Sequence, residues 1–271
     1  MPELPEIETT RRGIAPHVIG QPVDAVVVRQ RQLRWPVPKA LMRELPGQTI
    51  ESVDRRGKYL LLNTAIGSVI LHLGMSGSLR IVPQAKTPEK YDHVDLVFAN
   101  GDCLRLRDPR RFGAVLWTKG DVTRHRLLAN IGPDPLAHSF GGDYLYRKSR
   151  GRTRAIRDLL IDSRIVAGVG NIYANEALYG AGIHPRRAAG RISRRRYQRL
   201  TQAIRTTLKR AIAAGGTTLR DFRGASGNPG YFQLTMQVYG REGEPCRRCR
   251  RPIRAAPLGG RRVFYCSRCQ L

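Results

Sequence analysis

The sequence is poor in acidic residues: 21 Asp and Glu stand against 48 Lys and Arg in 271 residues, a formal net charge of +27. It also lacks any apolar run close to the roughly 18 residues that a membrane-spanning helix requires. Its first residues, MPELPEIE, differ from the basic and then apolar start of a secretory signal peptide. We therefore expect a cytoplasmic protein with a polyanionic partner. Nucleic acid is the leading candidate and an anionic membrane surface the second.

The basic residues are concentrated in two stretches. Residues 184–210 contain ten Lys or Arg, residues 246–271 contain eight Arg, and neither stretch contains an acid. A solvated basic surface without a partner is the alternative interpretation of the net charge. The clustering instead favours a surface that follows the phosphates of a nucleic acid.

Cysteine is scarce too, but four of the five cysteines are regularly spaced. Cys246 and Cys249 form one C-x-x-C pair, Cys266 and Cys269 form another, and sixteen residues separate the pairs. This is the spacing of a four-thiolate zinc ribbon that holds one structural Zn²⁺. Two disulfides or redox pairs are the alternative, which a reducing cytoplasm disfavours. The fifth cysteine, Cys103, is expected to be a small, partly buried strand residue.

Apolar patterning divides the chain into a strand-rich part and a helical part. From about residue 20 to 130, short β-branched or alternating apolar runs are broken by turn residues. This pattern predicts a β-sandwich, preceded by one helix that begins at Pro5. The Pro- and Gly-rich stretch 132–142 is expected to be a linker. Helices follow it, one of them capped by Ser193 and ended by the glycines 215–216.

The N-terminal octet has unusual chemistry for so basic a chain. Removal of Met1 is expected, because the next side chain is small, and it would leave Pro2 with a secondary α-amine. An α-amino group has a pKa of about 8, so a useful fraction is nucleophilic at neutral pH. Its condensation with a sugar aldehyde would give an iminium cation, and Glu3 is placed to exchange a proton there. The alternative is structural: Pro2 and Pro5 shape the start of a helix and Glu3 interacts with its dipole.

Seven stretches resemble bacterial formamidopyrimidine-DNA glycosylase, in order and along the whole chain. They are MPELPEIE, RRGKYLL (55–61), HLGMSGSLR (72–80), DPRRFGA (108–114), GVGNIYANEALYGAGIHP (168–185), GGTTLRDF (215–222) and the C-terminal zinc ribbon. The resemblance implies a multidomain α+β fold. Its expected parts are a catalytic N-terminal β-sandwich domain with an N-terminal helix (1–132), a helix-two-turn-helix domain (133–224) and a β-hairpin zinc ribbon (225–271).

The resemblance also implies a function. The chain would be a bifunctional DNA glycosylase and AP lyase of base excision repair that removes oxidised purines, chiefly 8-oxoguanine and formamidopyrimidines, from double-stranded DNA. Pro2 would be the Schiff-base nucleophile at the sugar C1′, and Glu3 would protonate the deoxyribose ring. Lys58 would contact the phosphate of that sugar and act as proton donor in β-elimination. Arg261, in the zinc ribbon, would have this role in δ-elimination, and Glu6 would support the N-terminal loop.

A nucleotide must leave the base stack before its C1′ can be attacked. Met75 and Phe112 lie at expected loop tips, where apolar side chains can wedge between bases, although burial in the core is their commoner fate. Arg110 can offer paired donors to the orphaned base. The resemblance implies that these three residues fill the void and favour an orphaned cytosine. It implies further DNA contacts at Tyr91, Arg152 and Asn171.

The chain departs from the family at two positions. A lysine common in the family is Arg157 here, and Tyr91 occupies a position that is often histidine. Both changes keep a hydrogen-bond donor but alter its geometry. The stretch 217–231 corresponds to the family's flexible loop over the everted base.

Two other functions stay open. An endonuclease VIII-like glycosylase for oxidised pyrimidines is disfavoured by Leu4, because that branch usually has glycine there, and by the intact set of Met75, Arg110 and Phe112. A non-catalytic zinc-ribbon protein that binds nucleic acid would leave the N-terminal Pro-Glu pair unexplained. No oligomer interface is visible in the sequence, and a monomer is expected.

Overall fold

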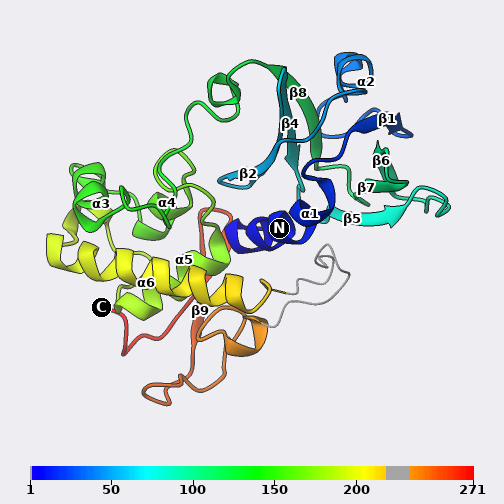
Figure 1. Ribbon diagram of the computed structural model, residues 1–271. Helices are drawn as coiled ribbons and strands as arrows, with labels where there is room; N and C mark the ends of the chain where they lie inside the picture. Colours follow the sequence, from blue (N-terminus) through cyan, green and yellow to red (C-terminus); the bar gives the residue numbers. More distant parts are fainter. Residues whose placement is uncertain (1, 218–231) are drawn as a thin grey trace. The chain divides into compact units, whose positions relative to one another are not determined.

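A computed structural model describes residues 2–217 and 232–271 of the chain (Figure 1). The chain forms two compact units. One contains residues 1–130 and 214–231, and the other contains residues 131–213 and 232–271. Within the described residues, no helix has both the length and the apolar character needed to cross a membrane.

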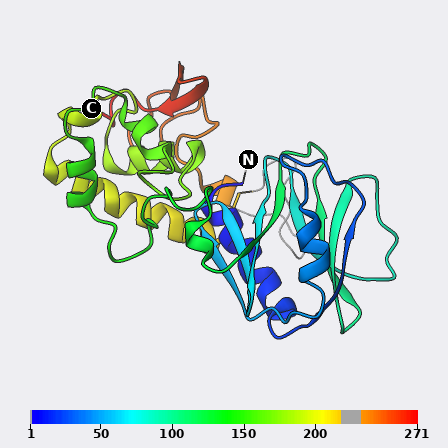
Figure 2. The ribbon, with the colours of Figure 1, turned by 90° about the horizontal axis from the view of Figure 1, so that it is seen from above.

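The first unit begins with the helix α1 (Leu4–Val18), followed by two antiparallel four-stranded sheets that form separate layers (Figure 2). One sheet has the order β1 (Val23–Val28), β6 (Asp92–Phe98), β7 (Asp102–Arg107) and β5 (Ser78–Pro83). The other has the order β2 (Ser52–Arg56), β3 (Tyr59–Thr64), β4 (Gly67–His72) and β8 (Ala114–Lys119). The expected β-sandwich with an N-terminal helix is confirmed.

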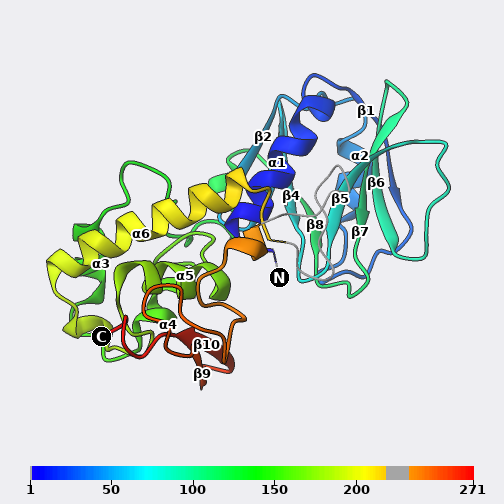
Figure 3. The same ribbon diagram turned by 90° about the horizontal axis from the view of Figure 1, so that it is seen from below.

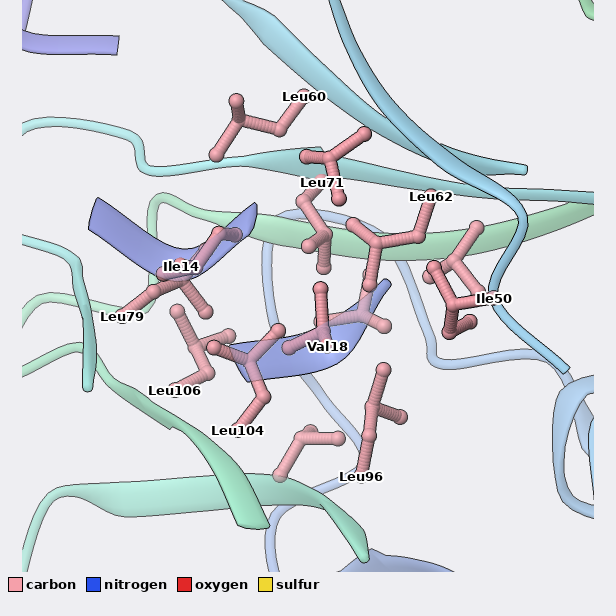
Figure 4. Packing of buried hydrophobic residues seen from close by; sticks show 14 of the residues in the cluster. Ile14, Val18, Ile50, Leu60, Leu62, Leu71, Leu79, Leu96, Leu104 and Leu106 are labelled. Atoms are coloured by element: carbon pink, nitrogen blue, oxygen red, sulfur yellow. The ribbon is translucent and has the colours of Figure 1, made fainter. Parts of the chain in front are cut away.

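The core of this unit lies between the two sheets, and α1 contributes to it. Ile14 and Val18 of α1 lie among leucines from both sheets (Figure 4). Leu60 of β3 pairs with Leu71 of β4 in the antiparallel register, so both side chains face the same side of the sheet. Cys103 on β7 is fully buried in a smaller apolar cluster, more completely than the sequence suggested.

The first unit also contains two short elements that the strand-rich pattern did not predict. These are the helix α2 (Lys39–Glu44) and the 3₁₀ turn η1 (Val122–Arg124). Only Leu41 of α2 is buried. A helix of six residues is too short to show the apolar repeat by which a sequence indicates a helix. The first helix begins at Leu4, one residue before the predicted start.

The second unit is helical and ends in a two-stranded hairpin. Its elements are α3 (Gly142–Ser149), α4 (Ile156–Ile161), α5 (Asn171–Ala181), η2 (Ala189–Arg191), α6 (Arg194–Ala213), η3 (Phe232–Thr235), β9 (Arg254–Leu258) and β10 (Arg261–Tyr265). The long helix α6 packs against α3 and α5 (Figure 3). A Cβ on Gly180 would lie 3.3 Å from the Cβ of Ala203, which shows how closely α5 and α6 approach.

Residues 132–142 are packed into the second unit, so the prediction that they form a linker is wrong. Phe140 is fully buried, and the guanidinium of Arg205 on α6 donates hydrogen bonds to the carbonyls of Pro135, Ala137 and Phe140. The Pro and Gly content indicated irregular backbone, which is present. It could not reveal that an arginine from a distant helix satisfies the carbonyls.

Candidate active site and nucleic-acid interface

A buried carboxylate holds the N-terminal Pro-Glu pair. Glu3 is the N-cap of α1 and Glu6 the third helical residue of a capping box, in which Glu6 Oε2 accepts the Glu3 N–H at 2.9 Å. The other oxygen of Glu6, Oε1, accepts the backbone N–H of Thr217 at 2.8 Å. Glu6 is fully buried, and Pro2 and Glu3 are buried as well. The backbone is therefore fixed at Glu3, the residue that directly follows Pro2.

The turn that carries Lys58 is linked to the same helix. Lys58 is half-buried, in the turn between β2 and β3. Arg55 at the end of β2 donates to the carbonyl of Gly57 at 3.4 Å and to Glu8 of α1 at 3.1 Å. The Glu8–Arg55 pair thus connects α1, which starts beside Pro2, to the turn of Lys58.

Glu8 is the centre of an ion-pair network. Its carboxylate receives hydrogen bonds from Arg11, Arg12 and Arg55 at 2.8–3.1 Å. Burial of the carboxyl raises its pKa, but the hydrogen bonds from the three arginines outweigh burial and hold the pKa at about 2. Glu8 is therefore ionised at every physiological pH, and the three guanidinium groups are held in place on α1 and β2.

Met75 and Phe112 are exposed, which their predicted role at loop tips requires. Their exposed fractions are 39% and 45%, among the largest of the apolar residues. Arg110 stacks on the Phe112 ring, with its guanidinium carbon 4.9 Å from the ring centroid. The β4–β5 loop of Met75 and the β7–β8 loop of Phe112 touch, because a Cβ on Gly74 would lie 2.4 Å from the carbonyl carbon of Phe112. The structure thus brings all three residues together outside the core.

A buried histidine, which the sequence did not single out, supports the Met75 loop. His72 Nδ1 accepts the backbone N–H of Gly74 at 3.0 Å, so Nε2 carries the ring proton of the neutral imidazole. Burial, with the charges of Arg34 and Lys58, lowers the pKa of His72 to about 4. The ring is consequently neutral at pH 7, and the hydrogen bond to the loop persists.

The other predicted DNA contacts are accessible to different degrees. Tyr91 is half-buried, with the charged ends of Lys90 and Arg107 over its ring at 5.6 and 5.5 Å. Arg152 is exposed and donates to the carbonyl of Lys148 at 2.6 Å. Asn171, the first residue of α5, is 8% exposed. Tyr91 thus lies in the first unit and the other two in the second.

Helix α5 holds the hairpin that carries Arg261. The Asn171 side chain donates to the carbonyl of Arg262 at 2.9 Å, and Asn175 accepts the N–H of Phe264 at 2.8 Å. Arg261 is exposed at the start of β10, and no hydrogen bond or ion pair of its side chain is found among the described residues. Asn171 therefore has a structural role, which the sequence did not predict.

Arg157, the departure noted in the sequence, is buried beneath the hairpin. Its side chain is fully buried, it donates to the carbonyl of Leu258, and it lies 3.2 Å from Asp158. Burial lowers the pKa of Arg157, Asp158 opposes this effect and the charge of Arg261 adds to it. Arg157 thus supports the turn between β9 and β10.

The four spaced cysteines form a metal site. All four Sγ atoms of Cys246, Cys249, Cys266 and Cys269 lie within 4.8 Å of one another. Tetrahedral coordination with Zn–S bonds of about 2.3 Å places sulfurs about 3.8 Å apart. The Cys246–Cys269 and Cys249–Cys266 pairs, at 3.9 and 3.4 Å, fit this geometry. With four thiolates the site is closed, so a bound Zn²⁺ would be structural.

Two buried carboxylates have positions that the sequence did not reveal. Glu176 on α5 accepts the backbone N–H groups of Gln237, Val238 and Tyr239 at 2.8–2.9 Å. Burial raises the pKa of Glu176, and these amides partly offset the effect. Asp108, in the DPRRFGA stretch, is fully buried beside the Phe112 loop. Asp108 is an acid among basic neighbours in the sequence, which could have drawn attention to it, whereas Glu176 has no such signal.

Three family models match successive parts of the chain. The model described as the formamidopyrimidine-DNA glycosylase N-terminal domain matches residues 1–115. The formamidopyrimidine-DNA glycosylase H2TH domain matches residues 131–223, and the zinc finger found in FPG and IleRS matches residues 243–271. Together these matches cover well over half of the chain.

Individual relatives agree with the family models. Formamidopyrimidine-DNA glycosylase of Syntrophotalea carbinolica is 59% identical over 270 residues, which is 100% of both chains. A Lactococcus lactis FPG variant solved with DNA containing Fapy-dG has a TM-score of 0.92 at 33% identity, and the match covers 99% of each chain. Wild-type Lactococcus lactis Fpg solved with DNA containing an oxidised pyrimidine has a TM-score of 0.91 at 34% identity, again covering 99% of each chain.

Proposed function

Because the chain belongs to the formamidopyrimidine-DNA glycosylase family, we propose that it excises oxidised purines from DNA and that Pro2 and Glu3 carry out this reaction. The protein is a DNA glycosylase of base excision repair, with the AP lyase activity that is typical of this family. DNA is its partner, and one structural zinc ion is its metal.

The observation that carries the proposal is the double hydrogen bond of Glu6. Its two carboxylate oxygens hold the N–H of Glu3 and the N–H of Thr217, which are 214 residues apart in sequence. A purely structural helix start would need only the capping box. The further bond fixes the residue next to Pro2 against Thr217, the first residue of the stretch 217–231 that corresponds to the family's loop over the everted base. Residues 218–231 of that stretch lie outside the described residues.

In the proposed first step, loss of Met1 leaves the Pro2 amine as the nucleophile. Its nitrogen forms a bond to C1′ of the deoxyribose, the glycosidic bond breaks, and the base leaves with the bonding electrons and takes up the proton that the amine loses. Glu3 protonates the ring oxygen, the sugar opens, and the nitrogen and C1′ become an iminium cation. This cation acidifies the C2′ proton and so prepares the strand for elimination.

In the proposed lyase steps, two eliminations release the sugar. Loss of a C2′ proton breaks the C3′–O bond, with Lys58 donating a proton near that phosphate. A second proton loss breaks the C5′–O bond, with Arg261 in the corresponding role at the other phosphate. Both products keep their phosphates, which leaves a gap of one nucleotide. Hydrolysis of the last iminium bond releases the sugar remnant and regenerates the Pro2 amine.

We assign the remaining residues to DNA. Met75, Arg110 and Phe112 fill the place of the everted nucleotide, supported by their common exposure and by the stacking of Arg110 on Phe112. Tyr91 and Arg152 contact the backbone. Asn171 reaches a phosphate only if its bond to the Arg262 carbonyl is given up or shared.

The domain division and the location are part of the same proposal. The three parts are a catalytic domain (1–132), a helix-two-turn-helix domain (133–224) and a zinc ribbon (225–271). A DNA substrate of this type places the protein at the nucleoid, in the cytoplasm of a bacterium.

Borohydride trapping tests the nucleophile. The native protein, incubated with an 8-oxoguanine:cytosine duplex and sodium borohydride, is expected to form a covalent adduct, because reduction fixes the iminium bond. Pro2→Gly, or an extension of the N-terminus, should abolish or strongly reduce this adduct. Pro16→Ala is the matched control, because Pro16 is an exposed proline of the same helix. Trapping that survives a blocked N-terminus would exclude Pro2 as the nucleophile.

A thymine glycol duplex tests the alternative substrate. This comparison is needed because Lactococcus lactis Fpg has been solved in complex with DNA that contains an oxidised pyrimidine. We expect faster excision of 8-oxoguanine than of thymine glycol under the same conditions. The reverse order would favour the endonuclease VIII-like function, and binding without trapping on either duplex would favour a non-catalytic protein.

A further inference from the structure

Two loops that are distant in sequence form one exposed tip in the first unit. Met75 belongs to the loop between β4 and β5, and Phe112 to the loop between β7 and β8. A Cβ on Gly74 would lie 2.6 Å from the backbone nitrogen of Gly113, and Gly74 has a φ of +61°. The backbones therefore touch where only glycine fits. Contact alone does not prevent the loops from sliding against each other, so a directional bond is needed to fix them.

The carboxylate of Asp108 supplies this bond. Asp108 is fully buried, its Oδ1 accepts the hydroxyl hydrogen of Ser76 at 3.2 Å, and its Oδ2 accepts the N–H of Gly113 at 2.7 Å. Ser76 directly follows Met75, and Gly113 directly follows Phe112. One side chain thus joins the two loops one residue beyond each exposed apolar side chain.

Both donors to this carboxylate are uncharged, although the chain has 48 basic residues. A buried carboxylate is costly unless hydrogen bonds satisfy it, so the loss of either donor weakens the arrangement strongly. An ion pair would have tolerated more variation in geometry. Directional hydrogen bonds from a hydroxyl at 3.2 Å and a backbone amide at 2.7 Å fix the position of the carboxylate more narrowly.

Asp108 is itself anchored to the sheet. Its N–H donates to the carbonyl of Tyr91 at 3.0 Å, and its carbonyl is bonded by His93 Nε2 at 2.9 Å. The same carbonyl accepts the N–H of Arg111 at 3.2 Å, and Arg111 has a φ of +55°, unusual for a residue other than glycine. The surrounding strands therefore hold the Phe112 loop in a strained shape.

We propose that Asp108 is a positioning residue that couples the two loops, so that Met75 and Phe112 enter the duplex as one rigid wedge. This inference rests on the proposed function, because it assumes that both side chains replace an everted nucleotide. Two separate loops would each have to be ordered during eversion, whereas a coupled pair is ordered before DNA arrives. The coupling acts on eversion and leaves the chemistry at C1′ unchanged.

Ser76→Ala tests the coupling with the smallest change. It removes the hydroxyl that bridges the loops and keeps the Asp108–Gly113 bond. Ser78→Ala is the matched control, because Ser78 is also a buried serine of this segment, and its side chain has no described bond to Asp108. Each variant is compared with the unaltered protein on two substrates: an 8-oxoguanine:cytosine duplex, which requires eversion, and a single-stranded abasic oligonucleotide, which does not.

The expected result is a change in the ratio of the two rates. Ser76→Ala should slow single-turnover cleavage of the duplex roughly tenfold, the effect of losing a hydrogen bond to a charged group. Cleavage of the single strand should stay within about twofold, which also shows that the variant is folded. Ser78→Ala should leave both rates near those of the unaltered protein.

A double-mutant cycle supplies the second readout. If the wedge acts as one unit, Met75→Ala and Phe112→Ala together should slow duplex cleavage clearly less than the product of their single effects. In the Ser76→Ala background, the two effects should multiply. An unchanged duplex rate for Ser76→Ala, equal losses on both substrates, or the same cycle in both backgrounds would overturn the coupling. Absence of cleavage by the unaltered protein would instead contradict the proposed function.

Discussion

At the scale of the residue, buried carboxylates organise a protein with few acids. Glu6 holds two backbone amides, Asp108 joins two loops, and Glu176 accepts three amides. Glu8, in contrast, is held by three arginines. The buried acids Asp92 and Asp95 of β6 also pair with arginines, so the interior acids act partly on the backbone and partly on cations, and most of the 48 basic residues remain available for phosphate. This division explains why the acids of MPELPEIE are compatible with a DNA-binding protein.

Glu8 gives a prediction about pH. Its folded pKa of about 2 lies below the ordinary 4.5, so its contribution to the free energy of unfolding is complete above pH 4.5 and is lost as pH falls toward 2. The shift corresponds to roughly 3 kcal/mol at pH 7. The difference in unfolding free energy between the unaltered protein and Glu8→Gln, measured with urea, should therefore fall below about half of its neutral value at pH 3.

The control for this measurement is Glu51→Gln, because Glu51 is exposed and has no ion pair among the described residues. Its substitution should change the unfolding free energy little at either pH. A Glu8→Gln difference that stays constant from pH 7 to pH 3 would show that the arginine network does not lower the pKa of Glu8.

At the scale of the element, the sequence was informative where a pattern is local. Ser193, the predicted cap, accepts the N–H of Arg196 at 3.4 Å, and the buried face of α6 includes apolar residues three or four positions apart: Tyr197, Leu200, Ile204 and Leu208. The C-x-x-C pairs predicted the metal site for the same reason. Helix α3, in contrast, was hidden behind a Pro- and Gly-rich stretch, and α2 is too short to show a period.

Long-range contacts are the part of the candidate site that could not be predicted from the sequence. The Glu6–Thr217 bond joins residues 211 positions apart, and the Ser76–Asp108 bond joins residues 32 apart. Neither pair has a spacing that indicates contact, because it depends on how the strands and helices pack. The resemblance to a family located Pro2, Glu3 and Lys58, but the residues that hold them became visible only in the structure.

The zinc-binding hairpin depends on its metal for stability. The hairpin β9–β10 has only five residues per strand, and the apolar cluster around the cysteines is small. Such a hairpin has little stability of its own, so metal binding should supply most of it. Cys249→Ser is expected to lose zinc, to lower the thermal transition and to weaken binding to duplex DNA. Zinc content by atomic absorption, together with the melting curve, measures this effect.

Cys103→Ala is the control for the zinc experiment. Cys103 is buried on β7 in the other unit and is no metal ligand, so the variant should retain one zinc ion per chain. If Cys249→Ser also retained one zinc ion per chain, the four-thiolate assignment would be wrong.

At the scale of the whole molecule, the net charge determines how binding depends on salt, but not every cation counts. Arginines already paired with acids release few counterions on binding. Arg194, for example, is bound by both carboxylate oxygens of Asp143 at 2.6 and 2.7 Å. Arg152 is exposed, and within residues 2–217 and 232–271 its side chain engages only a backbone carbonyl, so its charge is available to a phosphate. The number of phosphates neutralised should therefore be far below 27.

This difference can be measured as a slope. Each neutralised phosphate contributes about 0.9 to the dependence of log K on log salt concentration for duplex DNA. Arg152→Ala should reduce the slope by about 1, as expected for one lost phosphate contact, whereas Arg194→Ala should leave it nearly unchanged. Binding is measured between about 50 and 200 mM salt on a duplex with an uncleavable abasic analogue. Equal slopes for the Arg152 variant and the unaltered protein would place Arg152 away from the DNA backbone. A reduced slope for Arg194→Ala would show that its pairing with Asp143 opens when DNA binds.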